Sequence, residues 1–348
     1  MGNSPPDRDR PAPSAVNTET SAGPPPLPAR ARIRLAAITA CTTAVGAVVG
    51  CIARPDALTA ITLVPACAWL IFGLLGVGAA CWAGNRRMAW GLSLFWTVFA
   101  WGWCEDLAAL GRQWSAREPV LAENARLVRV VTWNCDGQAH CVDDLKPWDP
   151  EIVLLQEAPA PEAIKRISQE LFGDSGRVLI AGDLAIIARG TLSQIAVDPQ
   201  RQFLGAEVLL DDDRSLTCVC LRLEPPVSRL DGWRAEFWNE HRDRREQHRQ
   251  KIEELLTTVR KVRAGGLVIG GDFNTPPLDR ALDELRSGLR DAFTQAGVGW
   301  GATGTNDWPL FRVDQLWTDA RLTAVRAEAV KTRHSDHRLV VADFLLSD

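Results

Sequence analysis

Polar residues that can bind metals or transfer protons follow or interrupt the apolar segments in the C-terminal part of this 348-residue chain. They are Asn134, Glu157, Asp272, Asp314, Asp336 and His337. A single polar residue at a strand end needs no functional explanation, because Asp and Asn favour turns. Repeated at several strand ends, the pattern indicates a shared cleft, since a rigid sheet can aim side chains from its strand ends at one place.

The residue types limit the chemistry of such a cleft. Carboxylate and amide oxygens without a neighbouring Cys or His cluster select Mg²⁺, Mn²⁺ or Ca²⁺ rather than zinc or copper. Proteins usually hold Mg²⁺ with one or two carboxylates, waters and substrate phosphate, so the set predicts phosphate chemistry. In such a site a metal polarises the phosphoryl oxygen, a carboxylate or imidazole handles the attacking water, and a cationic group stabilises the developing charge.

Short strands alternate with helices around these residues. Apolar runs predict strands over 127–132, 151–156, 267–271, 312–318 and 339–346. Turn signals at 181–183 and 211–213 predict two hairpins, with strands over 178–180, 184–188, 208–210 and 216–221. Helical spacing covers 161–172 and 243–262. The charged face of the second helix is typical of a solvated surface and contains Arg244, Arg245, His248 and Arg249.

Five ordered motifs over residues 127–346 resemble those of the endonuclease/exonuclease/phosphatase superfamily of metal-dependent phosphoesterases. The motifs are Thr132-Trp133-Asn134, Leu155-Gln156-Glu157, Gly271-Asp272-Phe273-Asn274, Arg312-Val313-Asp314 and Ser335-Asp336-His337. Gly-Asp-Phe-Asn alone is a weak signal, but five motifs in family order make a strong one. The resemblance implies an α/β (α+β) four-layer sandwich over residues 127–348, with two mixed β-sheets packed face to face and helices outside.

The resemblance also implies a metal site. Glu157 would bind a Mg²⁺ or Mn²⁺ ion directly, with Asn134 and Asp336 beside it. Asp136 matches one form of the first motif and would lie next to these ligands.

The same resemblance assigns catalytic roles. Asp272 would orient or deprotonate the attacking water, and Asn274 would hold the phosphate or the water. His337 would contact the scissile phosphate, while Asp314 would fix the tautomer of that histidine and raise its basicity. Arg222 departs from the family pattern, because it stands where many members have a histidine. An Arg cannot donate a proton at neutral pH, since its pKa exceeds ~12, but it can clamp phosphate through two hydrogen bonds.

Residues 35–104 form a different kind of segment. Runs without a charged residue cover 35–53, 57–84 and 88–104. A bilayer core of ~30 Å needs ~20 helical residues, so we expect about three transmembrane helices before the folded domain. Two spans are the alternative, because the third run lies at the lower limit of length.

Arginines predict the orientation of these helices. Arg30, Arg32 and Arg34 precede the first run, and Arg86 and Arg87 separate the second from the third. Because positively charged loops stay cytoplasmic, three spans predict a multi-pass membrane protein whose catalytic domain is extracytoplasmic. With two spans the domain would be cytoplasmic. The lipobox-like segment 48–51 offers a rival anchor, which the further apolar runs make redundant.

Composition describes the remaining segments. Residues 1–34 are rich in proline and lack aromatic side chains, which predicts a disordered tail, and residues 105–126 are expected to be a linker. With 46% hydrophobic and 24% charged residues and no fixed period, the whole chain is neither disordered nor fibrous. Acidic residues outnumber basic ones after residue 104, which counts mildly against a long duplex as the substrate.

These features together predict a membrane-anchored, divalent-metal-dependent hydrolase of phosphoester bonds, with diesters slightly favoured over monoesters. The substrate is left open between a lipid head group, a small phosphodiester and nucleic acid, and no obligate protein partner is expected. Two alternatives remain. One is a nuclease acting on DNA or RNA, and the other is a non-catalytic phosphate- or metal-binding module on the same fold, prompted by Arg222.

Overall fold

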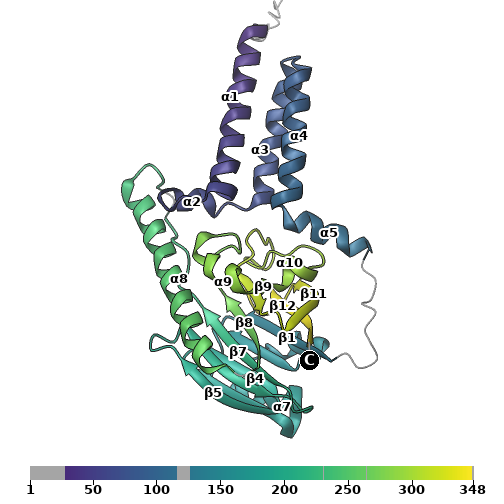
Figure 1. Cartoon of the computed structure of the whole chain (residues 1–348), viewed down its shortest axis with the longest axis vertical. Coiled ribbons are helices and arrows are strands. Elements are labelled where there is room, and N and C mark those ends of the chain that lie inside the picture. Colours follow the sequence, from purple (N-terminus) through teal and green to yellow (C-terminus); the bar gives the residue numbers. More distant parts are fainter. Residues whose placement is uncertain (1–27, 116–125, 230, 264, 347–348) are drawn as a thin grey trace, which may run out of the picture.

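The computed structural model describes residues 28–115, 126–229, 231–263 and 265–346. Residues 127–346 form a domain with two sheets, and residues 29–115 form helices that stand on one end of it (Figure 1). The two-sheet domain therefore coincides with the segment that contains the five motifs.

The described strands form two six-stranded sheets. In spatial order, the first sheet contains β11 (Leu322–Val330), β12 (Leu339–Leu346), β1 (Leu127–Asn134), β2 (Ile152–Gln156), β4 (Leu184–Arg189) and β3 (Gly176–Ala181). The second contains β5 (Thr191–Val197), β6 (Phe203–Leu209), β7 (Ser215–Arg222), β8 (Gly266–Asp272), β10 (Asp314–Thr318) and β9 (Arg290–Asp291). Both sheets are mixed, because β1–β2 and β7–β8 are parallel while the other neighbours are antiparallel.

Apolar side chains from both sheets form the central core. Val130 and Leu154 of the first sheet belong to the same fully buried cluster as Cys220 and Val268 of the second. Strands in both sheets are near-continuous apolar runs because each sheet is covered on both faces. This packing of one sheet on the other confirms the predicted sandwich.

Helices cover the outer faces of the two sheets. α8 (Ala235–Val262) packs Ile252, Leu255 and Val259 into one cluster with Ile269 of β8. α7 (Pro161–Phe172) packs against the first sheet in the same way. The shorter helices of the domain are α6 (Val142–Leu145), α9 (Asp283–Gly288) and α10 (Ala292–Ala296), with 3₁₀ turns at Lys146–Trp148, Gly173–Ser175 and Arg280–Leu282.

Strand register brings the polar strand ends together. Asn134 is paired with Gln156 in the parallel β1–β2 ladder, so Glu157 follows at the same edge. Arg222 is paired with Asp272 across β7–β8, and the antiparallel partner of Asp272 on β10 is Asp314. The register therefore brings these polar strand ends to one edge of the sandwich.

Most predicted elements are found, with shifted ends. α7 and β12 have the predicted bounds, and both hairpins form, as β3–β4 and β6–β7. α8 begins at Ala235, eight residues before the predicted start, because the apolar stripe that marks this helix lies only in its second half. Strands β5 and β11 were not predicted, although β5 pairs with β6 and β11 pairs with β12.

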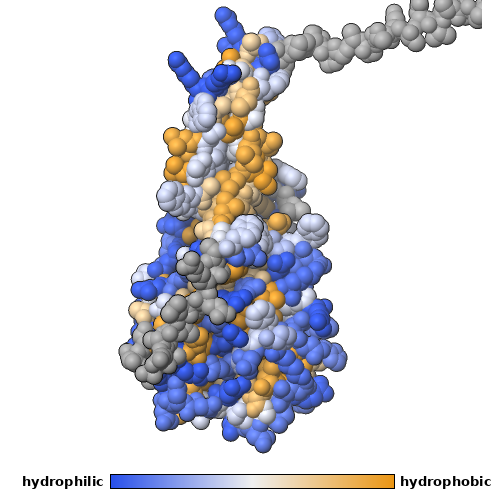
Figure 2. Space-filling view, turned by 90° about the vertical axis from the view of Figure 1, so that its right-hand side faces the viewer, coloured by the Kyte–Doolittle hydropathy of each residue, from blue (hydrophilic) through white to orange (hydrophobic). Residues whose placement is uncertain are grey.

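Three long helices stand side by side on the domain: α1 (Ala29–Ala47), α3 (Ala66–Trp82) and α4 (Arg86–Trp103) (Figure 1). A π-helical segment, Val48–Ala53, extends α1, and α2 (Thr59–Thr62) lies at the base of the group. The helices approach closely at glycines, since a Cβ at Gly73 would lie 2.4 Å from the ring of Trp96. The middle part of these helices is largely apolar on the face seen in Figure 2. Leu74 and Trp90 of this group of helices are more than two thirds exposed.

The expectation of about three membrane spans is not confirmed. By length and composition one described helix can cross a membrane, Ala29–Ala53, with 25 residues and a mean hydropathy of 2.0. The run over 57–84 is broken into Asp56–Thr62 and Ala66–Trp82, bent by 76°, and counts as a second span at most. α4 does not qualify, because Arg86 and Arg87 form its first turn. The multi-pass arrangement is thus not supported, and the side of the membrane stays a prediction.

Two further expectations about the N-terminal part are corrected. Residues 29–34, predicted as part of a disordered tail, belong to α1, and residues 1–27 lie outside the described residues. The first half of the predicted linker is a helix, α5 (Glu105–Ser115). It packs on the domain, where Ala109 is fully buried and its carbonyl accepts a hydrogen bond from the N–H of Gly299.

Candidate active site

The residues predicted to do chemistry converge at one edge of the sandwich, contributed by both sheets. Asn134 ends β1, Arg222 ends β7, Asp272 ends β8, Asp314 begins β10, Glu157 follows β2, and Asp336 and His337 precede β12. Side-chain hydrogen bonds link Asn134, Glu157, Asp272 and Arg222 across the two sheets, and Asp314 and His337 form a separate pair.

Asn134 joins carboxylates of the two sheets. Its side chain is almost fully buried, and Nδ2 donates to Glu157 Oε1 at 3.0 Å and to Asp272 Oδ2 at 3.2 Å. Its Oδ1 accepts the backbone N–H of Asp136 at 3.2 Å. The exposed residue Asp136 therefore joins the network through its backbone.

Asp314 and His337 form an ion pair in which the carboxylate is buried and the imidazole is partly exposed. His337 Nδ1 donates to Asp314 Oδ2 at 2.8 Å, and Asp314 is 1% exposed. Burial alone would lower the pKa of His337, but the carboxylates of Asp314, Asp272 and Asp336 raise that pKa to about 10. The imidazole is therefore a cation at neutral pH, with Nδ1 fixed and Nε2 as its second donor.

Asp272 lies beside this pair with its carboxylate held from two sides. The backbone N–H of Asn274 donates to Asp272 Oδ1 at 3.0 Å, and Asn274 Nδ2 donates to Oδ2 at 3.1 Å. Burial, and then the charge of Asp314, raise the pKa of Asp272 to about 7, against the opposing effect of His337. A carboxylate with a pKa near the working pH is suited to accept a proton.

Arg222 bridges the carboxylates of Glu157 and Asp183, and it shares Glu157 Oε1 with Asn134. Its Nη2 donates to Glu157 Oε1 and its Nη1 to Asp183 Oδ2, each at 2.6 Å. The guanidinium thus places a permanent positive charge beside the carboxylate of Glu157, the residue that was expected to bind the metal.

Three residues of the site have left-handed backbone conformations. Asp136, Glu157 and Asn274 have φ values of 50°, 45° and 48°. Such conformations are unfavourable for residues with a Cβ and cluster at functional sites. Each follows a strand directly or by one residue, so the turn redirects a polar side chain at the point where the sheet ends.

Three supporting residues were not assigned a role from the sequence. Ser335 Oγ donates to the carbonyl of Asn134 at 2.7 Å and accepts the N–H of His337 at 2.9 Å. Thr303 Oγ1 accepts the N–H of Asp314 at 3.0 Å. Asp183 was interpreted only as part of a hairpin turn. Ser335 stood inside a recognised motif, which was the available signal, whereas Thr303 lies in an unremarkable Gly-rich loop.

The donor set fits a hard divalent cation. Carboxylate oxygens of Asp272 and Asp314 lie within 4.8 Å of each other, and Glu157 is joined to Asp272 through Asn134. Oδ1 of Asp314 is buried without a hydrogen-bond partner among the described residues. Carboxylate and amide oxygens are the ligands that Mg²⁺ and Mn²⁺ prefer. The structure thus offers oxygen ligands both around Glu157 and in the buried cluster with Asp272.

Comparison with protein families identifies the class of this domain. The model of the endonuclease/exonuclease/phosphatase family matches residues 131–337, which is more than half of the chain. The chain therefore belongs to this family, and the resemblance seen in its motifs is confirmed.

The solved structures that this chain matches share little sequence with it. A family protein from Bacteroides thetaiotaomicron is 12% identical, with a TM-score of 0.49 over 65% of this chain and all of the other. The D. rerio TDP2 complexed with a single-stranded DNA product is 16% identical, with a TM-score of 0.46 over 63% of this chain and 98% of the other. The catalytic domain of human Nocturnin with bound sulfate is 16% identical, with a TM-score of 0.45 over 64% of this chain and 97% of the other. No curated protein matches the sequence.

Proposed function

We propose that this chain is a divalent-metal-dependent phosphoesterase that uses water to hydrolyse a phosphoester bond, with phosphodiesters favoured. The observation that supports it most is the Asp314–His337 ion pair within 4.8 Å of the buried carboxylate of Asp272. A fixed imidazolium next to a carboxylate whose pKa is near neutrality suits attack of water on a phosphate.

Each side chain has a separate task in this proposal. Glu157, Asp336 and Asn134, with Asp136 beside them, would hold Mg²⁺ or Mn²⁺, which supplies Lewis-acid polarisation of the phosphoryl oxygen when bound. Asp272 accepts the proton of the attacking water, and Asn274 positions that carboxylate.

The cationic groups stabilise the charge that develops on the phosphate. His337 donates from Nε2 to a phosphate oxygen, while Asp314 keeps Nδ1 protonated. Arg222 adds a second positive charge at the edge of the site.

We also propose that the helices of residues 29–103 attach the enzyme to a membrane. Residues with exposed apolar side chains lie along these helices, including Ile38, Leu74, Leu94 and Trp101, the last 92% exposed. A soluble protein rarely exposes a large contiguous apolar surface, whereas a lipid environment covers it. Recovery of the full chain in the membrane fraction, and its release by detergent but not by alkaline carbonate, tests this attachment.

Hydrolysis of bis-p-nitrophenyl phosphate tests the catalytic proposal. The full chain, purified in detergent, is assayed with Mg²⁺, with Mn²⁺ and with EDTA. We expect turnover with metal and none with EDTA, and Asp272→Asn should reduce the rate by ~10²-fold or more. Asp211→Asn, at an exposed turn, is the matched control and should keep the rate.

The assay also separates the alternatives. If the chain hydrolyses the monoester p-nitrophenyl phosphate but not bis-p-nitrophenyl phosphate, the enzyme is a monoesterase and not a diesterase. A folded chain that hydrolyses neither compound with any metal would contradict the enzyme and favour a non-catalytic binding module.

A further inference from the structure

Two buried cysteines lie next to each other directly behind the first motif of the candidate active site. Cys135 follows Asn134, the last residue of β1, and Cys141 comes immediately before α6. Both side chains are 0% exposed, and both belong to the buried cluster between the first sheet and α7. A side-chain hydrogen bond joins the two thiols. Both cysteines are free in this structure, so the pair is present as two thiols in contact.

The chain between the two cysteines consists of turns and contains no strand or helix. The N–H of Gln138 donates to the carbonyl of Cys135 at 3.0 Å, and the N–H of Asp144 donates to the carbonyl of Cys141 at 3.2 Å. A disulfide requires an S–S distance of ~2.05 Å and Cβ atoms ~3.8 Å apart. Because the intervening residues form turns, they can absorb the approach of the two sulfurs while β1 and α6 stay in place.

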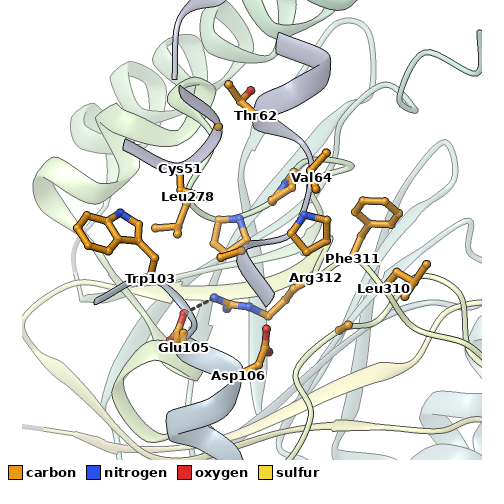
Figure 3. A pocket seen from close by; sticks show the side chains of 16 residues that line it. Cys51, Thr62, Val64, Trp103, Glu105, Asp106, Leu278, Leu310, Phe311 and Arg312 are labelled. Carbon is orange, nitrogen blue, oxygen red and sulfur yellow. Dashed lines mark hydrogen bonds and ion pairs between the residues drawn. The ribbon is translucent and has the colours of Figure 1, made fainter. Parts of the chain in front are cut away.

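The other cysteines of the domain are placed differently. Cys218 and Cys220 lie in the core between the two sheets, so the first sheet separates them from the pair. They stand on β7, whose pairing with β6 and β8 fixes both positions. In the helical part, Cys51 lines the hollow above the domain, and the residues described around that hollow include no second cysteine (Figure 3). Within the domain, the two cysteines that can be joined are therefore Cys135 and Cys141.

The turn that begins at Cys135 also supports the proposed metal site. The N–H of Gly137 donates to the carbonyl of Glu157 at 2.7 Å, and Cys135 Sγ lies 3.4 Å from the same carbonyl oxygen. The N–H of Asp136 is bound to Asn134 Oδ1. The turn thus holds two residues proposed to bind the metal, while its thiols lie in the cluster beneath α7. A bond between the thiols would fix the turn from behind without involving the carboxylates.

We propose that Cys135 and Cys141 form a disulfide when the chain meets an oxidising low-molecular-weight disulfide, and that this bond braces the turn beside Asn134 and Glu157. With glutathione disulfide, one cysteine attacks the S–S bond and releases a first glutathione. The second cysteine then attacks the mixed disulfide and releases the other. The two cysteines lose two protons and two electrons, which reduce glutathione disulfide to two thiols. The bracing rests on the proposed metal binding, whereas the disulfide itself does not.

Peptide mapping of the full chain tests the disulfide. The chain in detergent is equilibrated with glutathione and glutathione disulfide, its remaining thiols are alkylated in urea, and it is cleaved on the N-terminal side of Asp residues. Cleavage before Asp136 separates the two cysteines, so a disulfide alone keeps them in one product. We expect the equilibrium constant for oxidation to be about tenfold or more higher in the folded chain than in concentrated urea, because folding holds the two thiols in contact.

Cys218 and Cys220 are the internal control for this mapping. Both are as fully buried as the pair, and both should be recovered alkylated from the folded chain after the same treatment. An equilibrium constant that is no higher in the folded chain than in urea would overturn the proposal. Recovery of Cys135 joined to a different cysteine would overturn it as well.

Titration of the full chain with Mn²⁺ tests the bracing. We expect the oxidised chain to bind Mn²⁺ about threefold or more tightly than the chain reduced with a phosphine, because a fixed turn loses less freedom on binding. Cys141→Ala, and independently Cys141→Ser, should give the same affinity after both treatments. Equal affinities of the two wild-type forms, or tighter binding by the reduced form, would overturn the bracing. Absence of Mn²⁺ binding in both forms would instead contradict the proposed function and leave the disulfide intact.

Discussion

Arg222 donates to Glu157 Oε1 at 2.6 Å, so the position that departs from the family pattern holds the carboxylate expected to bind the metal. The second amino group of Arg222 is bound to Asp183 at the same distance. A positive charge so close to a ligand competes with a cation for that ligand. The departure therefore acts on metal affinity as well as on the phosphate.

Replacing this charge should strengthen metal binding. Arg222→Gln is expected to lower the dissociation constant for Mn²⁺ by about tenfold, because one unit charge beside Glu157 is removed. Isothermal titration of the full chain with Mn²⁺, without substrate, gives the affinity independently of turnover. Arg166→Gln, at an exposed position of α7, is the control and should not change it. Weaker binding in the Arg222 variant would mean that the guanidinium supports the ligand instead of competing.

The sequence was sufficient to predict the strands that build the site. Each is a short apolar run with a polar residue at its end, and pairing of β1 with β2 then brings Asn134 next to Glu157. The positions of Asp272 and Asp314 follow from the antiparallel pairing of β8 with β10.

Contacts between distant segments could not be predicted in this way. Arg222 and Asp183 are 39 residues apart and lie on different sheets, so their pairing depends on how the sheets stack. Arg245 was expected on a solvated face of α8 but is buried. It contacts Thr62, which lies 183 residues earlier in the chain at the base of the N-terminal helices. Counting apolar residues likewise did not reveal that the second run bends by 76°.

Removing the charge of Asp314 should shift the pH dependence of the reaction. The pKa of His337 is raised to about 10, so its imidazolium is present below that pH and is lost as the pH rises through it. In Asp314→Asn the largest attraction for this proton disappears, and the alkaline limb of the kcat profile should move to lower pH by more than about one unit. The profile is measured with bis-p-nitrophenyl phosphate and Mg²⁺. Asp211→Asn should keep the wild-type limb, and an unchanged limb in Asp314→Asn would remove His337 from the proposed role.

Arg245 should stabilise the contact between the helices and the domain. Its side chain is 1% exposed, and it donates to Asp56 at 3.1 Å and to Asp279 at 2.7 Å. Arg245→Met leaves the carboxylate of Asp279 buried without its partner, which is expected to cost ~3–5 kcal/mol of unfolding free energy. Denaturation followed by Trp fluorescence measures the loss.

Two variants show whether this loss comes from the buried charge. Arg245→Met combined with Asp279→Asn should recover part of the stability, because the uncompensated carboxylate is gone. Arg242→Met removes a pair with Asp243 in which both side chains are about half exposed, and should change stability by less than ~0.5 kcal/mol. Equal losses in the Arg242 and Arg245 variants would contradict the buried ion pair.

His248 should make the domain less stable in mild acid. The residue is 4% exposed, and its Nε2 donates to the carbonyl of Glu224 at 2.9 Å. Burial lowers the pKa of His248 from 6.5 to about 4, so as the pH falls the unfolded chain takes up this proton first. The stabilisation is complete above pH ~6.5 and is lost progressively towards pH ~4, by up to ~3 kcal/mol. Asp272, whose pKa is raised to about 7, contributes with the opposite sign over the same range, so the contribution of His248 is measured as the difference in unfolding free energy between the wild type and His248→Gln at a series of pH values. This difference should grow as the pH falls from ~6.5 to ~4, whereas His140→Gln, at an exposed position, should show none. His241, whose pKa burial also lowers, adds a contribution of the same sign as His248. A difference that does not change with pH would assign the acid sensitivity to another group.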